Sequence, residues 1–320
     1  MPLRTATLIE SLTAVGINNI LTSEPLARHN TWKIGGPADI LIEPASIEEL
    51  AAVIACVREH HANCVVIGDG SNILFSDDGF NGVVIKIGRA LSGCTIDGER
   101  IYVQAGIAVP RLARIAASAG LTGLEHISGI PGTLGGLVAM NGGSLGQWIG
   151  QAVETVRCID PDGNIMELHP SECDFSYRHS LFLTNPWIIT DVVLKLQLGE
   201  STQIIRRMLE IVRERRQKFP RRLPNCGSVF KRNLQMYEQF GPPGRVIEEV
   251  GLKGCRVGAA EVSHQHANFI INTGNATAND VLRLIALIRE RVYKHTQLRL
   301  ECEVRTITPT GQIHPAHRFL

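Results

Sequence analysis

Several features that would narrow the class of protein are missing from this chain of 320 residues. Its eight cysteines form no CxxC pair and no repeated spacing, which argues against zinc or a disulfide framework and predicts reduced thiols in a cytosol. No apolar run approaches the roughly 18 residues of a membrane span, and the N-terminus has no signal-peptide pattern. A formal net charge of +1 gives no general attraction to nucleic acid or anionic membranes. We therefore expect a cytoplasmic protein without membrane, nucleic-acid or obligate protein partners.

What is present is an ordinary globular composition, with 44% apolar and 20% charged residues. The chain exceeds the roughly 250 residues at which single cores stop growing, so we expect more than one domain. Two helices begin with capping boxes, at Ser46 with Glu49 and at Thr277 with Asp280. The 3.6-residue apolar period predicts helices at about 46–60, 110–119, 201–217 and 277–295.

Short β-branched runs bounded by Gly, Asn or Asp predict strands between these helices. The strands and helices interleave irregularly, so the predicted class is α+β. The basic, proline-containing stretch 217–225 should end the third helix and is the best candidate for a domain boundary. The predicted strands cover residues 64–68, 82–87, 100–106, 155–160, 187–198, 268–272 and 301–307.

A first glycine-rich loop, GDGSN at residues 68–72, directly follows a predicted strand. Its glycines permit positive φ and close backbone approach, so successive N–H groups can cradle a phosphate. The dinucleotide-binding fingerprint fails here, because Ile73 stands at its last glycine position and loop and strand follow in place of a helix. By itself this loop is equally compatible with a plain tight turn.

A second glycine-rich run, SGIPGTLGGLVAMNGG, covers residues 128–143. An ordinary surface loop has no need of so much bare backbone beside Leu134, Leu137 and Val138. A flat or diphosphate-bearing ligand lying on the chain explains the run, and a tightly packed turn at a domain junction is the alternative.

Seven blocks resemble, in order, the FAD-dependent UDP-N-acetylenolpyruvoylglucosamine reductases of peptidoglycan synthesis. Together they cover nearly the whole chain. They are NTWKIGGPA (30–38), GDGSNIL (68–74), GLEHISGIPGTLGGLVAMNGG (123–143), SYRHSLF (176–182), CGSVFK (226–231), GLKGCRVGAAEVSHQHANFIIN (251–272) and LECEVR (300–305).

The resemblance implies a two-part FAD-binding module of the vanillyl-alcohol-oxidase type, followed by a C-terminal α+β substrate-binding domain. It also implies non-covalent FAD, which NADPH reduces, and a UDP-sugar substrate whose enolpyruvyl ether becomes the lactyl ether of UDP-N-acetylmuramate. This is the activity of a UDP-N-acetylmuramate dehydrogenase. The expected bounds are 1–90 and 91–217 for the two FAD subdomains, 218–307 for the substrate domain and 308–320 for a tail.

The same resemblance assigns cofactor contacts to the two glycine-rich segments, as the backbone cradle for FAD. The residues are Gly68, Asp69, Gly70, Ser71, Asn72, Gly129, Pro131, Gly132, Thr133, Gly135, Gly136 and Asn141.

Three residues match the family's catalytic positions and should face the flavin. Arg178 would stabilise charge at the substrate carboxylate, and Ser228 would donate the proton. Glu303 would act with the arginine. Strand alternation places Glu301 and Glu303 on one face, so only the family pattern selects Glu303. Without the resemblance, Arg178 would be an ordinary surface arginine, and Cys226 is a rival to Ser228.

Tyr177, Lys218 and Lys253 are the expected substrate-binding residues, the two lysines for the diphosphate. A solvated basic helix face is the alternative for Lys218. Arg232 stands where the family usually has Asn, which leaves that amide contact open. No metal is expected, and His264 and His266 are interpreted as structural.

The short link after SYRHSLF indicates the family's second type, which lacks an inserted tyrosine loop. The alternative functions are an FAD-dependent sugar or alcohol oxidase and a non-catalytic nucleotide-binding protein.

Overall fold

The computed structural model describes residues 3–319, and its contacts divide the chain into two compact units. The first unit contains Met1–Thr22, Ile40–Asp69 and Gly82–Arg215. The second contains Ser23–Asp39, Gly70–Asn81 and Arg216–Leu320. The chain thus enters the second unit three times. The expected subdivision of the cofactor module at residue 90 stays a prediction.

A five-stranded antiparallel sheet forms the centre of the first unit, in the order β12-β11-β13-β7-β6. Burial alternates along β7 and along the second half of β13, as expected where one face packs on a core, while residues 188–190 at the start of β13 are all buried. The strands are β6 (Cys94–Asp97), β7 (Arg100–Gln104), β11 (Val153–Ile159), β12 (Ile165–Leu168) and β13 (Ile188–Lys195).

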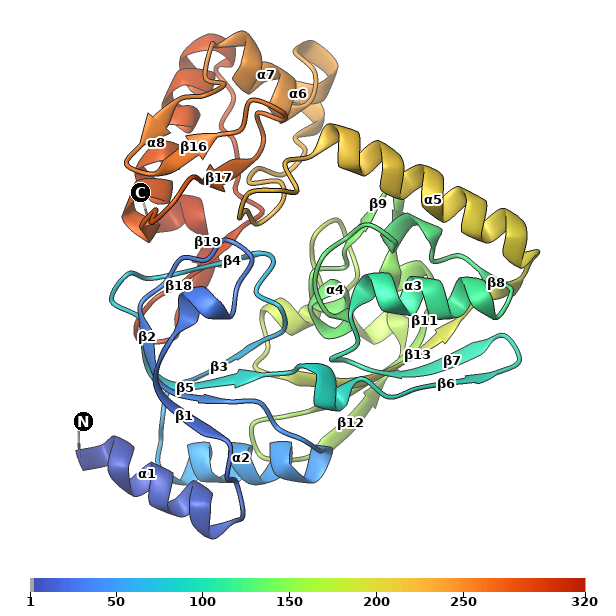
Figure 1. Ribbon diagram of the computed structural model, residues 1–320, viewed down its shortest axis with the longest axis vertical. Coiled ribbons are helices and arrows are strands. Elements are labelled where there is room, and N and C mark those ends of the chain that lie inside the picture. Colours follow the sequence, from blue (N-terminus) through green and yellow to red (C-terminus); the bar gives the residue numbers. More distant parts are fainter. Residues whose placement is uncertain (1–2, 320) are drawn as a thin grey trace. The chain divides into compact units, whose positions relative to one another are not determined.

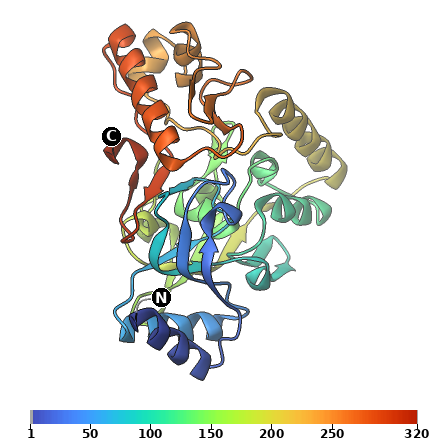
Figure 2. The same ribbon diagram turned by 60° about the vertical axis from the view of Figure 1, so that its left-hand side comes forward.

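A second sheet has the order β1-β2-β5-β3, and its β3 and β5 run parallel. Figure 2 shows α1 (Leu3–Ala14) and α2 (Ile47–Glu59) side by side. The Ser46 hydroxyl accepts from the Glu49 N–H at 3.2 Å and begins α2, as the capping box predicted. The strands are β1 (Ile20–Pro25), β2 (Pro37–Ile42), β3 (Cys64–Ile67) and β5 (Phe80–Lys86).

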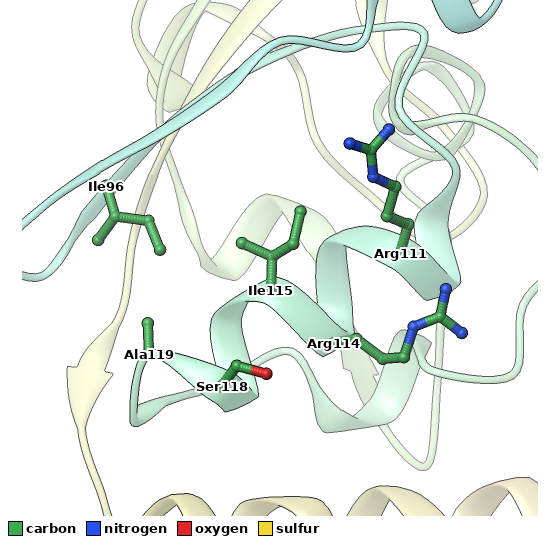
Figure 3. Close-up of a pocket in the computed structure, with 6 residues that line it drawn as sticks. All are labelled: Ile96, Arg111, Arg114, Ile115, Ser118 and Ala119. Atoms are coloured by element: carbon green, nitrogen blue, oxygen red, sulfur yellow. The ribbon is translucent and has the colours of Figure 1, made fainter.

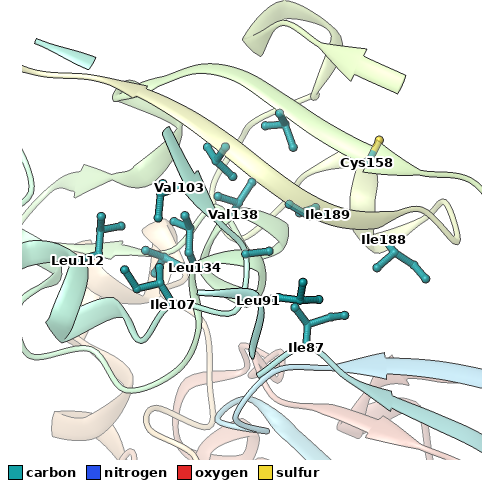
Figure 4. Packing of buried hydrophobic residues seen from close by; sticks show 14 of the residues in the cluster. Ile87, Leu91, Val103, Ile107, Leu112, Leu134, Val138, Cys158, Ile188 and Ile189 are labelled. Atoms are coloured by element: carbon teal, nitrogen blue, oxygen red, sulfur yellow. The ribbon is translucent and has the colours of Figure 1, made fainter. Parts of the chain in front are cut away.

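Apolar side chains from both helices and strands fill the core of the first unit (Figure 4). Leu112 of α3 (Val109–Ser118) and Leu134 and Val138 of α4 (Leu134–Ala139) are fully buried there. Burial therefore explains a helix inside the glycine-rich run, where propensity alone favours none. The remaining elements are β8 (Leu121–Thr122), β9 (Gly143–Ser144), β10 (Gln147–Trp148), β14 (Gln197–Leu198) and α5 (Ser201–Lys218).

The second unit has its own core around Trp32, Phe230 and the long helix α8 (Ala278–Thr296). The Thr277 and Asp280 capping box begins α8, and the Asp77 carboxylate also accepts from the N–H groups of Ala278 and Asn279. In Figure 1, α8 is the long orange-red helix, and the strands β18 and β19 follow it in the chain.

Two small sheets complete the second unit. β4 pairs in parallel with β18, which pairs with β19, and the other sheet has the order β15-β16-β17. Their bounds, with those of two further helices, are β4 (Ile73–Phe75), β18 (Arg305–Ile307), β19 (Ile313–Pro315), β15 (Arg256–Val257), β16 (Ala260–Val262), β17 (Ile270–Asn272), α6 (Leu234–Gln239) and α7 (Pro243–Glu249).

The α+β class and all four predicted helices are confirmed. The strand predicted over 301–307 is too long, because β18 begins only at Arg305 and Cys302 makes an isolated bridge with Phe230. All eight cysteines are free. None of the helices in the described range 3–319 is long and apolar enough to cross a membrane.

Candidate active site

The two glycine-rich segments meet inside the first unit. A Cβ atom at Gly68, directly after β3, would lie 2.1 Å from Thr133 Oγ1. Thr133 is buried ahead of α4, and it bridges to Ala108. Only glycine permits this approach, so the sequence at residue 68 is dictated by a segment far along the chain.

Residues 128–136 have the properties of a ligand cradle. Gly132 has φ +122°, and a Cβ at Gly136 would meet only Thr133 Oγ1, at 3.7 Å. The buried Ser128 hydroxyl has no hydrogen-bond partner in the described part of the chain. Buried hydroxyls are normally satisfied, so this one is a donor suited to a polar ligand. Bare backbone together with an unpaired hydroxyl fits a flavin nucleotide.

The second half of the run has another explanation. A Cβ at Gly142 would lie 2.6 Å from Leu137 Cδ1, and one at Gly143 would lie 2.0 Å from the Gln147 carbonyl oxygen. These two glycines are therefore required by packing within the chain itself, and Gly135 is likewise close-packed, since its Cβ would lie 3.0 Å from Ala105 Cβ. The ligand explanation applies to the other glycines of the run.

Asn141, one of the expected cofactor contacts, has a positive φ of 42° and is buried. Its Nδ2 donates to the Ser176 carbonyl at 2.9 Å, and its Oδ1 accepts from the Gly150 N–H at 3.1 Å. The side chain thus braces the turn that carries Arg178. Its contact with a cofactor stays a prediction.

Arg178 lies in a tight turn in which Ser176 and His179 exchange two backbone hydrogen bonds of 3.1 Å. Its φ of +56° is left-handed, which costs a non-glycine residue about 1–2 kcal/mol. The half-buried guanidinium lies 5.3 Å from the ring centre of the exposed Tyr177, and its Nη2 is 3.5 Å from the Gly143 carbonyl oxygen. This is one of nine such left-handed positions at non-glycine residues in the described chain, and at Arg178 it coincides with a half-buried charge.

The loop at residues 68–72 is divided between the units, with Gly68 and Asp69 in the first and the remainder in the second. Gly70 has φ +62°, and a Cβ there would lie 2.7 Å from the His29 carbonyl oxygen. Asn72 Nδ2 donates to the Glu303 carbonyl at 3.2 Å, and the Asn72 carbonyl accepts from Arg305. Asn72 of the predicted cofactor loop is therefore hydrogen-bonded to the segment that contains Glu303, a predicted catalytic residue.

Ser228 and Glu303 lie on neighbouring segments of the second unit. The Glu303 N–H donates to the Val229 carbonyl at 2.7 Å, beside the antiparallel bridge of Phe230 to Cys302. Ser228 is half-buried, and its hydroxyl has no partner among residues 3–319. Arg178 belongs to the first unit.

The two candidate glutamates differ in their surroundings. Glu301 is exposed, whereas Glu303 is half-buried. Burial, and after it the Glu303 carboxylate, raises the pKa of the Cys226 thiol well above its usual range. The Glu303 carboxylate therefore lies within electrostatic range of Cys226, two residues from Ser228, which favours Glu303 over Glu301. The same raised pKa leaves Cys226 a poor nucleophile or acid.

Lys218 and Lys253 are brought together around His266. Burial, then Lys218 and Lys253, lower the pKa of His266 to about 4, so its ring is neutral at pH 7. Phe219 and Phe269 pack against the ring at centroid distances of 5.3 and 5.1 Å. Lys253 Nζ is also paired with Glu248 Oε1 at 2.7 Å, so the two lysines lie beside a neutral, half-buried imidazole with one of their charges partly offset.

Arg232 and Asn233, which follow the CGSVFK block, make local contacts within the second unit. The Arg232 guanidinium stacks over Tyr237 at 4.2 Å. Asn233 Oδ1 accepts from the Met236 N–H at 2.8 Å and begins α6. The family usually has an asparagine at position 232. Asn233 does not take over the role of that asparagine, because its side-chain oxygen already caps α6.

An open groove of about 590 Å³ lies elsewhere, along α3 of the first unit (Figure 3). It contains none of the residues predicted to bind cofactor or substrate. Its lining residues are Ile96, Arg111, Arg114, Ile115, Ser118 and Ala119.

Sequence reasoning missed Asn268, whose buried side chain hydrogen-bonds both backbone groups of Phe230. The only signal was an asparagine at the head of the apolar strand NFIIN.

The fold and this site define a flavoprotein oxidoreductase, as comparison with known proteins bears out. Residues 38–169 match the FAD binding domain, and residues 219–307 match the C-terminal domain of UDP-N-acetylenolpyruvoylglucosamine reductase. UDP-N-acetylenolpyruvoylglucosamine reductase 1 of Corynebacterium glutamicum is 45% identical over 92% of this chain and 88% of its own. The reductase of Halalkalibacterium halodurans is 41% identical over 94% of this chain and 98% of its own.

The crystal structure of the reductase from Thermus caldophilus superposes with a TM-score of 0.75 at 36% identity, covering 90% of this chain and 98% of that one. The chain belongs to the UDP-N-acetylenolpyruvoylglucosamine reductase family.

Proposed function

We propose that the chain reduces UDP-N-acetylenolpyruvoylglucosamine to UDP-N-acetylmuramate, with Arg178, Ser228 and Glu303 as its catalytic residues. The family uses FAD and NADPH, and the cradle at residues 128–136, with Gly68 against it, is where this chain holds the FAD non-covalently. FAD held there and reduced by NADPH would supply a hydride for the outer carbon of the enolpyruvyl double bond. The protein must then stabilise negative charge next to the substrate carboxylate and deliver a proton to the inner carbon.

Arg178 supplies the first of these needs. A guanidinium pairs bidentately with a carboxylate and stays charged at any working pH. The strained, braced turn holds the charge in one place, which a flexible surface arginine would not do. Glu303 is assigned to the same step, acting with the arginine on the substrate carboxylate.

Ser228 supplies the proton. A new C–H bond forms at the inner carbon while the O–H bond of Ser228 breaks, and the alkoxide regains its proton from water. A serine hydroxyl is a weak acid, so the step needs a strongly basic carbanion and little water. The unpaired hydroxyl of Ser228 beside the Glu303 segment is the observation that carries this assignment.

Lys218 and Lys253 bind the diphosphate of the sugar nucleotide, and Tyr177 contacts the substrate beside Arg178. The two cations that face His266 support this placement. Only residues 184–187 separate the 3₁₀ helix Leu181–Leu183 from β13, which supports the second type of this family, without the tyrosine loop.

The test separates the two half-reactions in Ser228→Ala. Reduction of the bound flavin by NADPH should keep its wild-type rate, because no proton from Ser228 is needed there. Oxidation of the reduced enzyme by the enolpyruvyl substrate should slow by about 10²–10⁴-fold. Cys226→Ala is the matched control and should retain both rates within a few-fold. Equal loss of both half-reactions in Ser228→Ala would exclude Ser228 as the proton donor.

A further inference from the structure

The buried amide of Asn268 takes the place of a strand neighbour for Phe230. Asn268 is 6% exposed. Its Oδ1 accepts from the Phe230 N–H, and its Nδ2 donates to the Phe230 carbonyl, both at 2.9 Å. Its main-chain carbonyl accepts from the Val229 N–H, also at 2.9 Å. Three hydrogen bonds thus fix one edge of the segment that begins at Ser228.

The opposite edge of this segment is bonded to the residues around Glu303. Val229 accepts from the Glu303 N–H at 2.7 Å, and Lys231 donates to the Glu301 carbonyl at 2.9 Å. In an antiparallel pair, the residue between these two bonds turns its own N–H and C=O away from its partner. Phe230 is that residue, and Asn268 receives both of its groups.

On the other side of Ser228 the chain is held by fewer contacts, the Gly227 N–H donating only to the Asn225 side chain at 3.0 Å. Gly227 has φ +84°, and a Cβ at this position would meet nothing within 4 Å. If the three bonds to Asn268 were lost, residues 228–230 would keep only their bonds to the residues around Glu303, and the Ser228 hydroxyl would be held less firmly.

We propose that Asn268 is a positioning residue for proton transfer, holding the Ser228 segment in register with Glu303. The inference rests on the proposed function, because it assigns Asn268 no chemistry except through Ser228. An amide is suited to the task because it offers one donor and one acceptor side by side. A hydrocarbon of the same size would leave a buried N–H and C=O unpaired.

Asn268→Asp gives a test that pH can reverse. A protonated carboxyl presents one donor and one acceptor, as the amide does, whereas the ionised form presents only acceptors and repels the Phe230 carbonyl. Above the pKa of the new carboxyl, oxidation of the reduced enzyme by substrate should be slower than in wild type by about tenfold to a hundredfold. Lowering the pH should restore the rate to within a few-fold of wild type measured at the same pH.

Three controls distinguish positioning from general instability. Flavin reduction by NADPH and flavin content should match wild type at each pH. Asn268→Leu should be slow at every pH, because it cannot be rescued by protonation. In a Ser228→Ala background, Asn268→Asp should cause no further loss, because both changes act on the same step.

The outcomes separate this inference from the proposed function. If the wild-type chain does not reduce the substrate, the proposed function is wrong. If Ser228→Ala leaves substrate reduction intact, Ser228 is not the proton donor, and the positioning role of Asn268 fails with it. If Ser228→Ala abolishes substrate reduction while Asn268→Asp matches wild type across pH, only the positioning role is wrong. The same conclusion follows if Asn268→Asp slows both half-reactions equally, or loses activity further in the Ser228→Ala background.

Discussion

Arg178 combines a charged, half-buried side chain with a backbone conformation that arginine rarely adopts. Sequence alone left this residue indistinguishable from a surface arginine, apart from its match to the family pattern. The left-handed φ and the brace from Asn141 are tertiary properties, since they depend on a residue 37 positions earlier in the chain. They are consistent with a functional role at this residue, but the same φ region is found at eight other non-glycine residues, so the resemblance still carries the assignment.

We expect Arg178→Gly to separate stability from activity. Glycine adopts φ +56° without strain, so the free energy of unfolding should stay level or rise by up to about 1 kcal/mol. Substrate reduction should fall by about 100-fold or more, since the carboxylate loses its cation. Denaturant unfolding and steady-state turnover measure the two effects.

Arg178→Ala is the matched control, because it removes the same charge and keeps the strain. It should lose a similar amount of activity and be less stable than the glycine variant. A glycine variant less stable than the alanine variant would show that the turn is not strained.

Among the structural elements, the sequence predicted those that have an apolar period and a capping residue within their own segment. The helices that begin at Ser46 and Thr277 have both an apolar period and a capping side chain, and both caps form as expected. Helix α4 has neither signal and depends on burial of Leu134 and Val138. The role of Asn268 was likewise hidden, because its partner Phe230 lies 38 residues away.

The contact between the loop at Gly68 and the start of α4 also needs the folded chain to be seen. It predicts that Gly68→Ala weakens FAD binding, since a new Cβ would lie 2.1 Å from Thr133 Oγ1 and force the cradle open. Overpacking of this kind costs about 1–3 kcal/mol, or roughly tenfold to a hundredfold in affinity. Flavin titration monitored by fluorescence measures the effect.

The Thr133→Ala change added to Gly68→Ala removes the clashing oxygen and should recover part of the lost affinity. Wild-type affinity in Gly68→Ala alone would contradict the close approach.

At the scale of the whole molecule, two units share the proposed chemistry. The first contains the cradle and Arg178, and the second contains Ser228, Glu303 and the two lysines. Residues 23–39 and 70–81 belong with the C-terminal part, as Trp32 shows by donating to the Ile270 carbonyl at 2.8 Å. A short segment contains no local sign of which core it will join, so this grouping is not readable from periodicity or composition.

The central claim is that this chain passes electrons from bound flavin to an enolpyruvyl sugar nucleotide. The most direct measurement reduces the purified enzyme with NADPH without oxygen, adds UDP-N-acetylenolpyruvoylglucosamine and follows the flavin absorbance. We predict reoxidation of the flavin with one UDP-N-acetylmuramate formed per flavin. A flavin that stays reduced in the presence of this substrate, or a purified protein that binds no FAD, would contradict the claim.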